Sequence, residues 1–383
     1  MPEKPPVVLL ANVRWEALRE WSHILATLFS DAGYPTVFVE TTGIRKPPLR
    51  ITTGRRVLKR LLSVRSGGKK PASLSPNLTV YSPLVAPPTH RPFRRINRRL
   101  FVPRIVRDLR RLVGTAPVVM PFAPTRTTLD LVLGLEPRLT WYHCTLNYGD
   151  IPGALADIEE TERRLLKSAD IATVDSGFLK EKHRRVRPDM IRIESGVDFE
   201  LFRRADTGPL KSLARILYYF GRADEPWFDF DLVREVAEAG FTVRMLGTLS
   251  RPSFARLPGV EYLGEVPHKA LPEHLREADA LIIPYSITPF TRGTFPAKTY
   301  ESLATGKPVV ATPLPDLKRL VGHVYLGDGA EEFVGILRCL HESETAERVR
   351  ARVELARENS WEARFKRFEE ILWGRLGGER PSS

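Results

Sequence analysis

Short apolar runs of strand character alternate with helical segments along almost the whole of this 383-residue chain. Near the start, residues 7–11 read as a strand, residues 15–31 as a helix and residues 36–40 as a second strand, which follows an Ala-Gly-Tyr-Pro turn. Alternation of this kind is typical of a parallel sheet covered by helices. The sequence therefore predicts the α/β class.

The alternation occurs in two successive sets, which indicates two domains. The second set begins near Arg215, where a strand at 216–220 runs directly into Gly221. We predict a Rossmann-like domain over 1–205, a second over 214–359, and a C-terminal helix over 360–383 that packs back on the first domain. Further strands are predicted at 78–81, 117–121, 139–142, 171–174, 190–193, 242–246, 260–263, 280–283 and 309–311, and helices at 159–169, 231–239 and 271–277.

The positive charge of the chain is concentrated in one region. The formal net charge is +13, yet residues 45–111 contain 19 Lys and Arg and one acid, Asp108. This window therefore carries +18, which leaves about −5 for the remainder of the chain. We interpret it as a basic insertion in the first domain, and a charge of one sign favours an anionic partner.

Two parts of this insertion, residues 55–62 and 91–101, place apolar side chains among arginines at near-helical spacing. A helix of this kind can lie on an anionic membrane, where each basic residue contributes about 1 kcal/mol. No helix-turn-helix, zinc-finger or RNA-binding signature accompanies the charges, so we expect no nucleic-acid partner. A solvated helix face is the alternative. The predicted membrane or acceptor surface consists of Arg91, Arg94, Arg95, Arg98 and Arg99.

The spacing of the cysteines indicates whether the chain has disulfides or a metal site, and the length of its apolar runs indicates whether it spans a membrane. Cys144 and Cys339 lie far apart, without CxxC or histidine spacing, so we expect neither a disulfide framework nor a metal site. No apolar run reaches the roughly 18 to 20 residues of a membrane-spanning helix, and the start of the sequence lacks a secretory leader. We expect a cytoplasmic protein, peripheral at the inner face of the membrane.

A lysine stands in the first turn of one predicted helix. Pro296 suits the first helical position, and Gly306 suits the stop before the strand at 309–311. A cation at a helix N-terminus is unfavourable unless an anion lies nearby. Lys298 therefore indicates an anionic ligand, and Glu301, three residues on, shares its helix face. A surface pair between these two side chains is the alternative.

Several segments of the second half resemble glycosyltransferases of the GT-B fold, specifically the family 1/family 4 type group that elongates bacterial surface polysaccharides and glycolipids. The resemblance is carried by Gly221-Arg222, by residues 264–267 and 282–285, and by residues 295–311; in the first half it includes 159–170 and 196–202. It implies two Rossmann-like domains that face an interdomain cleft. The first would bind the acceptor, and the second a UDP-, GDP- or dTDP-linked sugar as co-substrate, with no cofactor and no metal.

The resemblance also implies roles for residues of the second domain. Glu301 would accept hydrogen bonds from the ribose hydroxyls of the donor, and the backbone around Thr294 would receive the diphosphate, whose charge Lys298 would neutralise.

Three more residues take their expected roles from the resemblance, and Gly221 belongs with them to the expected donor-binding set. Arg222, after Gly221, would contact the diphosphate, with local pairing as the alternative. The turn that contains Val266 would present its backbone edge to the nucleobase. Tyr285 would line the phosphate or sugar pocket, with core or rim packing as the alternative.

The sequence departs from the family pattern at its acidic positions. Gly293 stands eight residues before Glu301, where a sugar-facing glutamate is common, and Leu146 and Asn147 replace two aspartates of a Tyr-Asp-x-x-Asp-Asp pattern. An inverting transfer needs a base whose pKa lies near neutrality.

We predict His143 and Asp150 as the candidate catalytic bases. The intrinsic pKa of histidine is suitable, and the aspartate would serve with a raised pKa. A satisfied histidine at a strand end and a turn aspartate are the alternatives. A retaining mechanism would use the donor phosphate and backbone groups, and the sequence leaves that choice open.

The leading hypothesis is a transferase that moves a sugar from a nucleotide-sugar donor to a membrane-associated glycolipid or polysaccharide acceptor. A nucleotide-sugar epimerase or a phosphorylase of the same fold is one alternative, although neither needs the arginine-rich insertion. The substitutions at the acidic positions also allow a catalytically silent nucleotide- or glycan-binding subunit.

Overall fold

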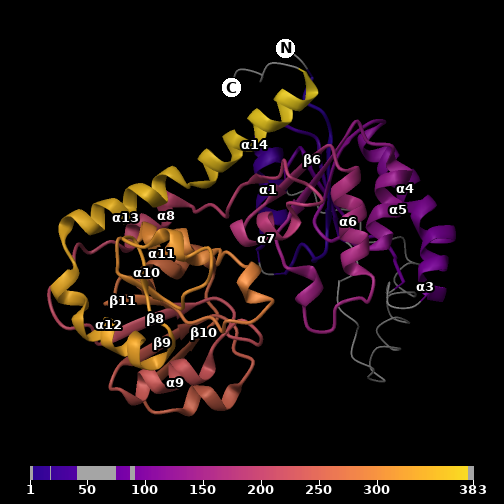
Figure 1. The fold of residues 1–383 in the computed structure, drawn as a ribbon. Helices are drawn as coiled ribbons and strands as arrows, with labels where there is room; N and C mark the ends of the chain where they lie inside the picture. Colours follow the sequence, from indigo (N-terminus) through magenta and orange to yellow (C-terminus); the bar gives the residue numbers. More distant parts are fainter. Residues whose placement is uncertain (1–2, 18, 41–74, 87–90, 378–383) are drawn as a thin grey trace. The chain divides into compact units, whose positions relative to one another are not determined.

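The computed structural model describes residues 3–17, 19–40, 75–86 and 91–377. The predicted amphipathic segment 55–62 lies outside the described residues, and of Arg91 only the backbone is described. The chain forms two compact units (Figure 1), one made of residues 1–174, 179–192 and 376–383 and the other of residues 175–178 and 193–375. The domain bounds expected from the sequence, and the packing of the C-terminal helix on the first domain, stay predictions.

The first unit is built on a parallel sheet whose strands lie in the order β3-β2-β1-β4-β5-β6-β7. Every residue of β1, β4, β5 and β6 is buried, because helices cover a parallel sheet on both faces. The strands are β1 Val7–Ala11, β2 Thr36–Glu40, β3 Leu78–Tyr81, β4 Val118–Pro121, β5 Leu139–Cys144, β6 Ile171–Val174 and β7 Ile191–Arg192.

The helices of this half follow the strands in chain order. Helices α4 and α5 lie side by side (Figure 1), and their apolar faces pack on β1 and β2. Helix α1 begins six residues later than the sequence predicts, because the backbone N–H of Glu20 bonds to His23 Nδ1 at 3.1 Å and starts the helix there. The helices are α1 Trp21–Asp31, α3 Arg91–Ile96, a π-helical segment Asn97–Phe101, α4 Val102–Val113, α5 Arg126–Leu135, α6 Ile158–Ser168 and α7 Gly177–His183.

The second unit repeats the design with a parallel sheet in the order β10-β9-β8-β11-β12-β13. Helix α9 lies on one side of this sheet, and α10 and α11 lie on the other (Figure 1). The strands are β8 Ile216–Phe220, β9 Thr242–Leu246, β10 Val260–Gly264, β11 Ala280–Ile283, β12 Val309–Ala311 and β13 Tyr325–Leu326. The helices are α8 Phe199–Phe202, α9 Phe230–Glu238, α10 Leu271–Leu275, α11 Lys298–Ala304, α12 Gly329–Ser343, α13 Ala346–Glu358 and α14 Trp361–Leu376.

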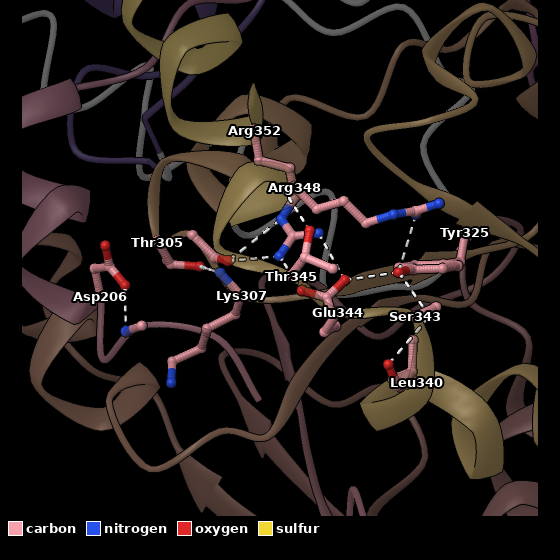
Figure 2. Close-up of polar contacts among 12 residues, drawn as sticks. Asp206, Thr305, Lys307, Tyr325, Leu340, Ser343, Glu344, Thr345, Arg348 and Arg352 are labelled. Atoms are coloured by element: carbon pink, nitrogen blue, oxygen red, sulfur yellow. Dashed lines mark hydrogen bonds and ion pairs between the residues drawn. The ribbon is translucent and has the colours of Figure 1, made fainter. Parts of the chain in front are cut away.

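A buried ion pair holds the C-terminal end of α11 (Figure 2). The guanidinium of Arg352 and the carboxylate of Glu344 are both fully buried and form an ion pair. Arg352 also donates to the carbonyl of Gly306 from Nη2 at 2.8 Å and from Nε at 3.3 Å. Tyr325 donates to the same carboxylate at 2.7 Å. Because a cation is favourable at a helix C-terminus, this contact fixes α11 from its far end.

The α/β prediction, with two parallel sheets in two units, is confirmed. Among the described residues, no helix is long and apolar enough to cross a membrane.

Candidate functional site

The Lys298 amine lies in a buried niche beyond β8 and β11 of the second unit. Its side chain is 8% exposed, and Nζ donates to the hydroxyl oxygens of Tyr219 at 3.0 Å and Tyr285 at 3.2 Å. Burial lowers the pKa of the amine to about 7, against the opposing effect of the Glu301 and Asp224 carboxylates. An amine so close to losing its charge in water-free surroundings is typical of a functional site.

Two glycines give the chain room beside this amine. Gly221, after β8, has φ +114°, and a Cβ there would lie 3.0 Å from Lys298 Nζ. Gly247, after β9, has φ +118°, and a Cβ there would lie 2.1 Å from the carbonyl oxygen of Gly221. Both backbones therefore require glycine, for conformation and for space.

Glu301 has a different hydrogen-bond partner from the one the sequence suggests. Its Oε1 accepts a hydrogen bond from His268 Nε2 at 2.8 Å. The carboxylate acts on Lys298 through its charge, by raising the pKa of the amine. The direct surface pair between Lys298 and Glu301 is therefore not formed, because the lysine side chain turns into the niche.

His268 also places the turn that contains Val266. This turn follows β10, whose last residue, Gly264, accepts a hydrogen bond from the backbone N–H of Gly247 at 2.8 Å. Val266 is half-buried against the core of the second unit. The pair between His268 and Glu301 brings the turn alongside α11, so the two predicted elements of nucleoside recognition lie together.

Arg222 and Thr294, two further residues of the predicted donor set, differ in their hydrogen bonding. Arg222 Nη2 donates to Asp224 Oδ2 at 2.6 Å, with the arginine side chain 47% exposed, so the local pairing considered as its alternative is present. The Thr294 hydroxyl is buried, and among the described residues it has no hydrogen-bond partner. A buried polar group without a partner normally has a ligand, a water or an ion to satisfy it.

His143 occupies the environment of a core histidine in the first unit. The side chain is fully buried, and Nδ1 is hydrogen-bonded to Thr173 Oγ1 at 2.8 Å. The ring packs edge-on against Trp21, with 4.4 Å between the centroids. Burial lowers the pKa of this imidazole to about 3, so the ring is neutral near neutrality and is a weak base. These surroundings do not favour the predicted role as a general base.

Asp150 lies in a short turn after β5. Its Oδ2 accepts a hydrogen bond from Asn147 Nδ2 at 2.6 Å, and Lys182 Nζ lies 3.7 Å away. The side chain is 42% exposed. Asn147, which replaces a family aspartate, therefore positions Asp150 in a polar network, and Asp150 stays a candidate base.

The predicted basic surface divides into two kinds of arginine. Arg94 is largely buried and forms a bidentate pair with Asp157, at 2.6 and 2.7 Å, so it holds α3 against the start of α6. Arg95, Arg98 and Arg99 are exposed and, among the described residues, take part in no ion pair. The guanidinium of Arg94 is neutralised within the fold, which does not favour its predicted role, and the membrane or acceptor surface stays a prediction.

Sequence reasoning missed Tyr219, His268 and Asp224. Tyr219 was hidden within an apolar strand, although two adjacent tyrosines at a strand end are a usable signal. His268 lies 33 residues from its partner Glu301, and only the fold shows that they meet.

Residues 215–342 match the profile of the family described as Glycosyl transferases group 1. These residues form a group 1 glycosyl transferase domain. This domain contains the whole predicted donor set, namely Gly221, Arg222, Val266, Tyr285, Thr294, Lys298 and Glu301.

A curated bacterial protein is similar in sequence to part of this chain. The chain is 31% identical over 179 residues to TuaH of Bacillus subtilis (strain 168), whose name assigns it to teichuronic acid biosynthesis as a glycosyltransferase. This match covers 43% of the chain and 45% of TuaH, so it spans less than half of that relative.

Solved structures match the chain over nearly its whole length. Anabaena Alr3699/HepE, solved with UDP and glucose, has a TM-score of 0.67 at 13% identity, over 96% of this chain and 99% of that one. A glycosyltransferase from Rickettsia africae ESF-5 has a TM-score of 0.65 at 14% identity, over 98% and 100%. At these identities the likeness shows the fold, which is of the GT-B type.

Proposed function

We propose that this chain is a glycosyltransferase that moves a sugar from a nucleotide-sugar donor to a glycan or glycolipid acceptor of the cell surface. The observation that carries the proposal is the buried Lys298 amine, held by two tyrosine hydroxyls beside Glu301 within the glycosyl transferase domain. The UDP and glucose of the Anabaena relative and the biosynthetic assignment of TuaH support the same class of substrates.

Each residue of the niche has a chemical task in this proposal. A diphosphate would restore the full charge of the Lys298 amine, and Arg222 would exchange Asp224 for a phosphate oxygen. The Thr294 hydroxyl would gain the hydrogen-bond partner that it lacks. Glu301, oriented by His268, would accept hydrogen bonds from the ribose. Because two cationic side chains are at hand for the diphosphate, we propose that donor binding needs no divalent metal.

The donor site is tested by titrating the purified chain with UDP-glucose, GDP-mannose and dTDP-glucose in buffer without added Mg²⁺ or Mn²⁺. At least one donor should bind, and Lys298→Met and Glu301→Gln should weaken it by about tenfold or more, since a hydrogen bond to a charged group contributes about 1.5–3 kcal/mol. No binding by any donor would remove the proposal. Binding without transfer or hydrolysis would identify a silent subunit.

Lys307 provides a matched control for Lys298. It is a second buried lysine of the same domain, and its Nζ donates to the carbonyls of Ala278 at 2.7 Å and Arg276 at 3.0 Å. Lys307→Met should lower stability and leave donor affinity unchanged. Equal loss of affinity in both variants would mean that Lys298 acts only through folding.

We also propose that the chain acts at the cytoplasmic face of an anionic membrane. Phe93, Ile96 and Leu100 recur at helical spacing and are 41%, 38% and 65% exposed. Exposed arginines alternate with them, a pattern typical of helices that lie in a membrane interface. Asn97 anchors the segment from below, because its amide exchanges two hydrogen bonds with the backbone of Ala86, at 2.8 and 2.9 Å.

Sedimentation with vesicles of phosphatidylglycerol and phosphatidylcholine tests the membrane proposal. Changing Arg95, Arg98 and Arg99 together to glutamate should abolish binding. The matched control changes three exposed arginines of the second unit, Arg256, Arg338 and Arg350, by the same total charge and should still bind. Equal loss in both triple variants would show an effect of net charge alone.

A further inference from the structure

Three side chains of types that are common ligands of transition metals lie close together in the interior of the first unit. Cys144 ends β5, Glu162 lies in α6 and His183 ends α7, and all three are buried. Cys144 Sγ lies 3.4 Å from Glu162 Oε1, and His183 Nε2 lies 3.7 Å from Glu162 Oε2. One ligand atom from each residue lies within 4.8 Å of the other two. These distances bring a thiol, a carboxyl and an imidazole to one point.

The spacing of the ligand atoms fits a tetrahedral ion. With bonds of about 2.3 Å to sulfur and about 2.0 Å to nitrogen and oxygen, the ligand atoms around Zn²⁺ lie about 3.3–3.6 Å apart. The two distances to Glu162, one to each of its carboxyl oxygens, are close to this range. The ligand atoms of Cys144 and His183 lie within 4.8 Å of each other, so binding would need rotamer adjustment to bring them to the spacing of the tetrahedron.

The Glu162 carboxyl also has an outer hydrogen-bond donor. Tyr142 donates to Glu162 Oε1 at 2.6 Å, as outer hydrogen-bond donors do for ligating carboxylates.

One cation lies near the cluster. Lys182 donates to Asn147 Oδ1 at 2.5 Å and lies 3.7 Å from the carboxylate of Asp150 and 3.6 Å from that of Glu159. Two anionic side chains therefore offset the positive charge of Lys182.

We propose that Cys144, Glu162 and His183 bind a divalent transition-metal ion of the zinc class. A thiolate and an imidazole beside a carboxylate are ligands of Zn²⁺ and Co²⁺, whereas Mg²⁺ and Ca²⁺ take oxygen ligands. On binding, the Cys144 thiol releases its proton to solvent, and a water molecule fills the fourth position. The site lies in the first unit, whereas the donor site lies in the second, so its role is to tie β5, α6 and α7 together.

This assignment revises the expectation drawn from the sequence, which found no metal-binding spacing around the cysteines. Cys144 and Glu162 are 18 residues apart and come from a strand and a helix, and His183 ends a further helix. No local motif joins them, and only the packing of α6 and α7 beside β5 brings them together.

Titration of the full chain with Co²⁺, after removal of metals by a chelator, tests the proposal. Bound Co²⁺ should give thiolate-to-metal charge-transfer absorption that saturates at one ion per chain, and excess Zn²⁺ should remove it. Cys144→Ser should lack this absorption. Cys339→Ser is the matched control, because Cys339 is exposed and lies outside the cluster, and it should behave like the unmodified chain.

A second variant covers the case in which Cys144→Ser does not fold. His183→Gln should retain the thiolate signal with affinity for Co²⁺ weakened by about tenfold or more. Thermal unfolding without metal shows whether each variant is folded, and Zn²⁺ should raise the midpoint of the unmodified chain and of Cys339→Ser but not that of Cys144→Ser. No charge-transfer absorption in the unmodified chain, or its loss in Cys339→Ser instead of Cys144→Ser, would overturn the proposal.

Discussion

At the scale of single residues, the protonation of Lys298 links donor binding to pH. Burial lowers the pKa of the empty-site amine to about 7, and a bound diphosphate would raise it. Between the two pKa values, binding requires uptake of one proton, so the dissociation constant for UDP-glucose should rise about tenfold per pH unit above about pH 7. Titrations from about pH 7 to pH 9 should show this slope and show none for Lys298→Met.

The Lys298 amine also makes the free energy of unfolding depend on pH. The pKa of Lys298 is about 7 in the folded chain and 10.5 without burial. The unfolded chain therefore binds more protons between these values, so the unfavourable effect of burying this lysine shrinks as pH rises. In urea unfolding, the free energy of unfolding of the unmodified chain should therefore rise relative to that of Lys298→Met from about pH 7 toward pH 10. A constant difference would place the amine in solvent.

His143 gives a prediction that separates structure from catalysis. Because the ring is buried and bonded to Thr173, His143→Gln should reduce the free energy of unfolding by about 1–3 kcal/mol. Turnover of the folded fraction should remain within about twofold, since burial makes the imidazole a weak base near neutrality. Measuring the free energy of unfolding and the rate of sugar transfer on one preparation of His143→Gln distinguishes a structural role from a catalytic one. A loss of turnover by orders of magnitude with unchanged stability would restore His143 as the base.

At the scale of elements, the buried pair that holds α11 should dominate local stability. Arg352→Met leaves Glu344 buried without its partner, and the expected loss in the free energy of unfolding is about 3–5 kcal/mol. Adding Glu344→Leu removes the orphan charge, so the double variant should recover part of that loss. Urea denaturation of the two single variants and the double variant measures the coupling.

An exposed ion pair of α13, the helix that contains Arg352, serves as the comparison. Arg357 Nη1 lies 2.6 Å from Glu354 Oε2, with more than half of each side chain exposed. Breaking such a pair changes stability by about 0–1 kcal/mol. If Arg352→Met had an equally small effect, the buried contact with Gly306 would not hold α11.

The strands could be predicted from the sequence far better than the helix ends. Strands β1, β2, β8 and β9 have the predicted bounds, because buried parallel strands are continuous apolar runs. Helix α1 starts late because a side-chain contact of His23 decides its first residue. Helix α11 begins at Lys298 and not at Pro296.

At the scale of the whole molecule, the positions of the proposed donor residues in the fold were predictable where these residues follow strand ends or start a helix, because the sequence displays those features directly. Partners that meet across the fold were not predictable. His268 and Glu301 are 33 residues apart, and Arg94 is 63 residues from the Asp157 that neutralises it. No periodicity along the chain records such contacts, because they depend on how the helices pack on the sheet.

The uneven charge of the chain predicts that salt will weaken its binding to an anionic membrane much more than its binding to a nucleotide-sugar donor. Residues 45–111 carry a charge of +18, whereas the whole chain has a net charge of +13. The charges of the exposed Arg95, Arg98 and Arg99 are screened once the Debye length falls from about 10 Å at 0.1 M salt toward about 3 Å at 1 M. Lys298 is buried, so its attraction for a diphosphate is screened much less.

Raising NaCl from about 0.1 M to about 0.5 M should therefore lower partition onto phosphatidylglycerol vesicles by more than about tenfold. The dissociation constant for UDP-glucose should change by less than about threefold over the same range. The triple change of Arg95, Arg98 and Arg99 to glutamate should leave the second quantity unaltered at every salt concentration. Equal salt dependence of vesicle and donor binding would mean that the donor diphosphate is held by exposed charges and not in the Lys298 niche.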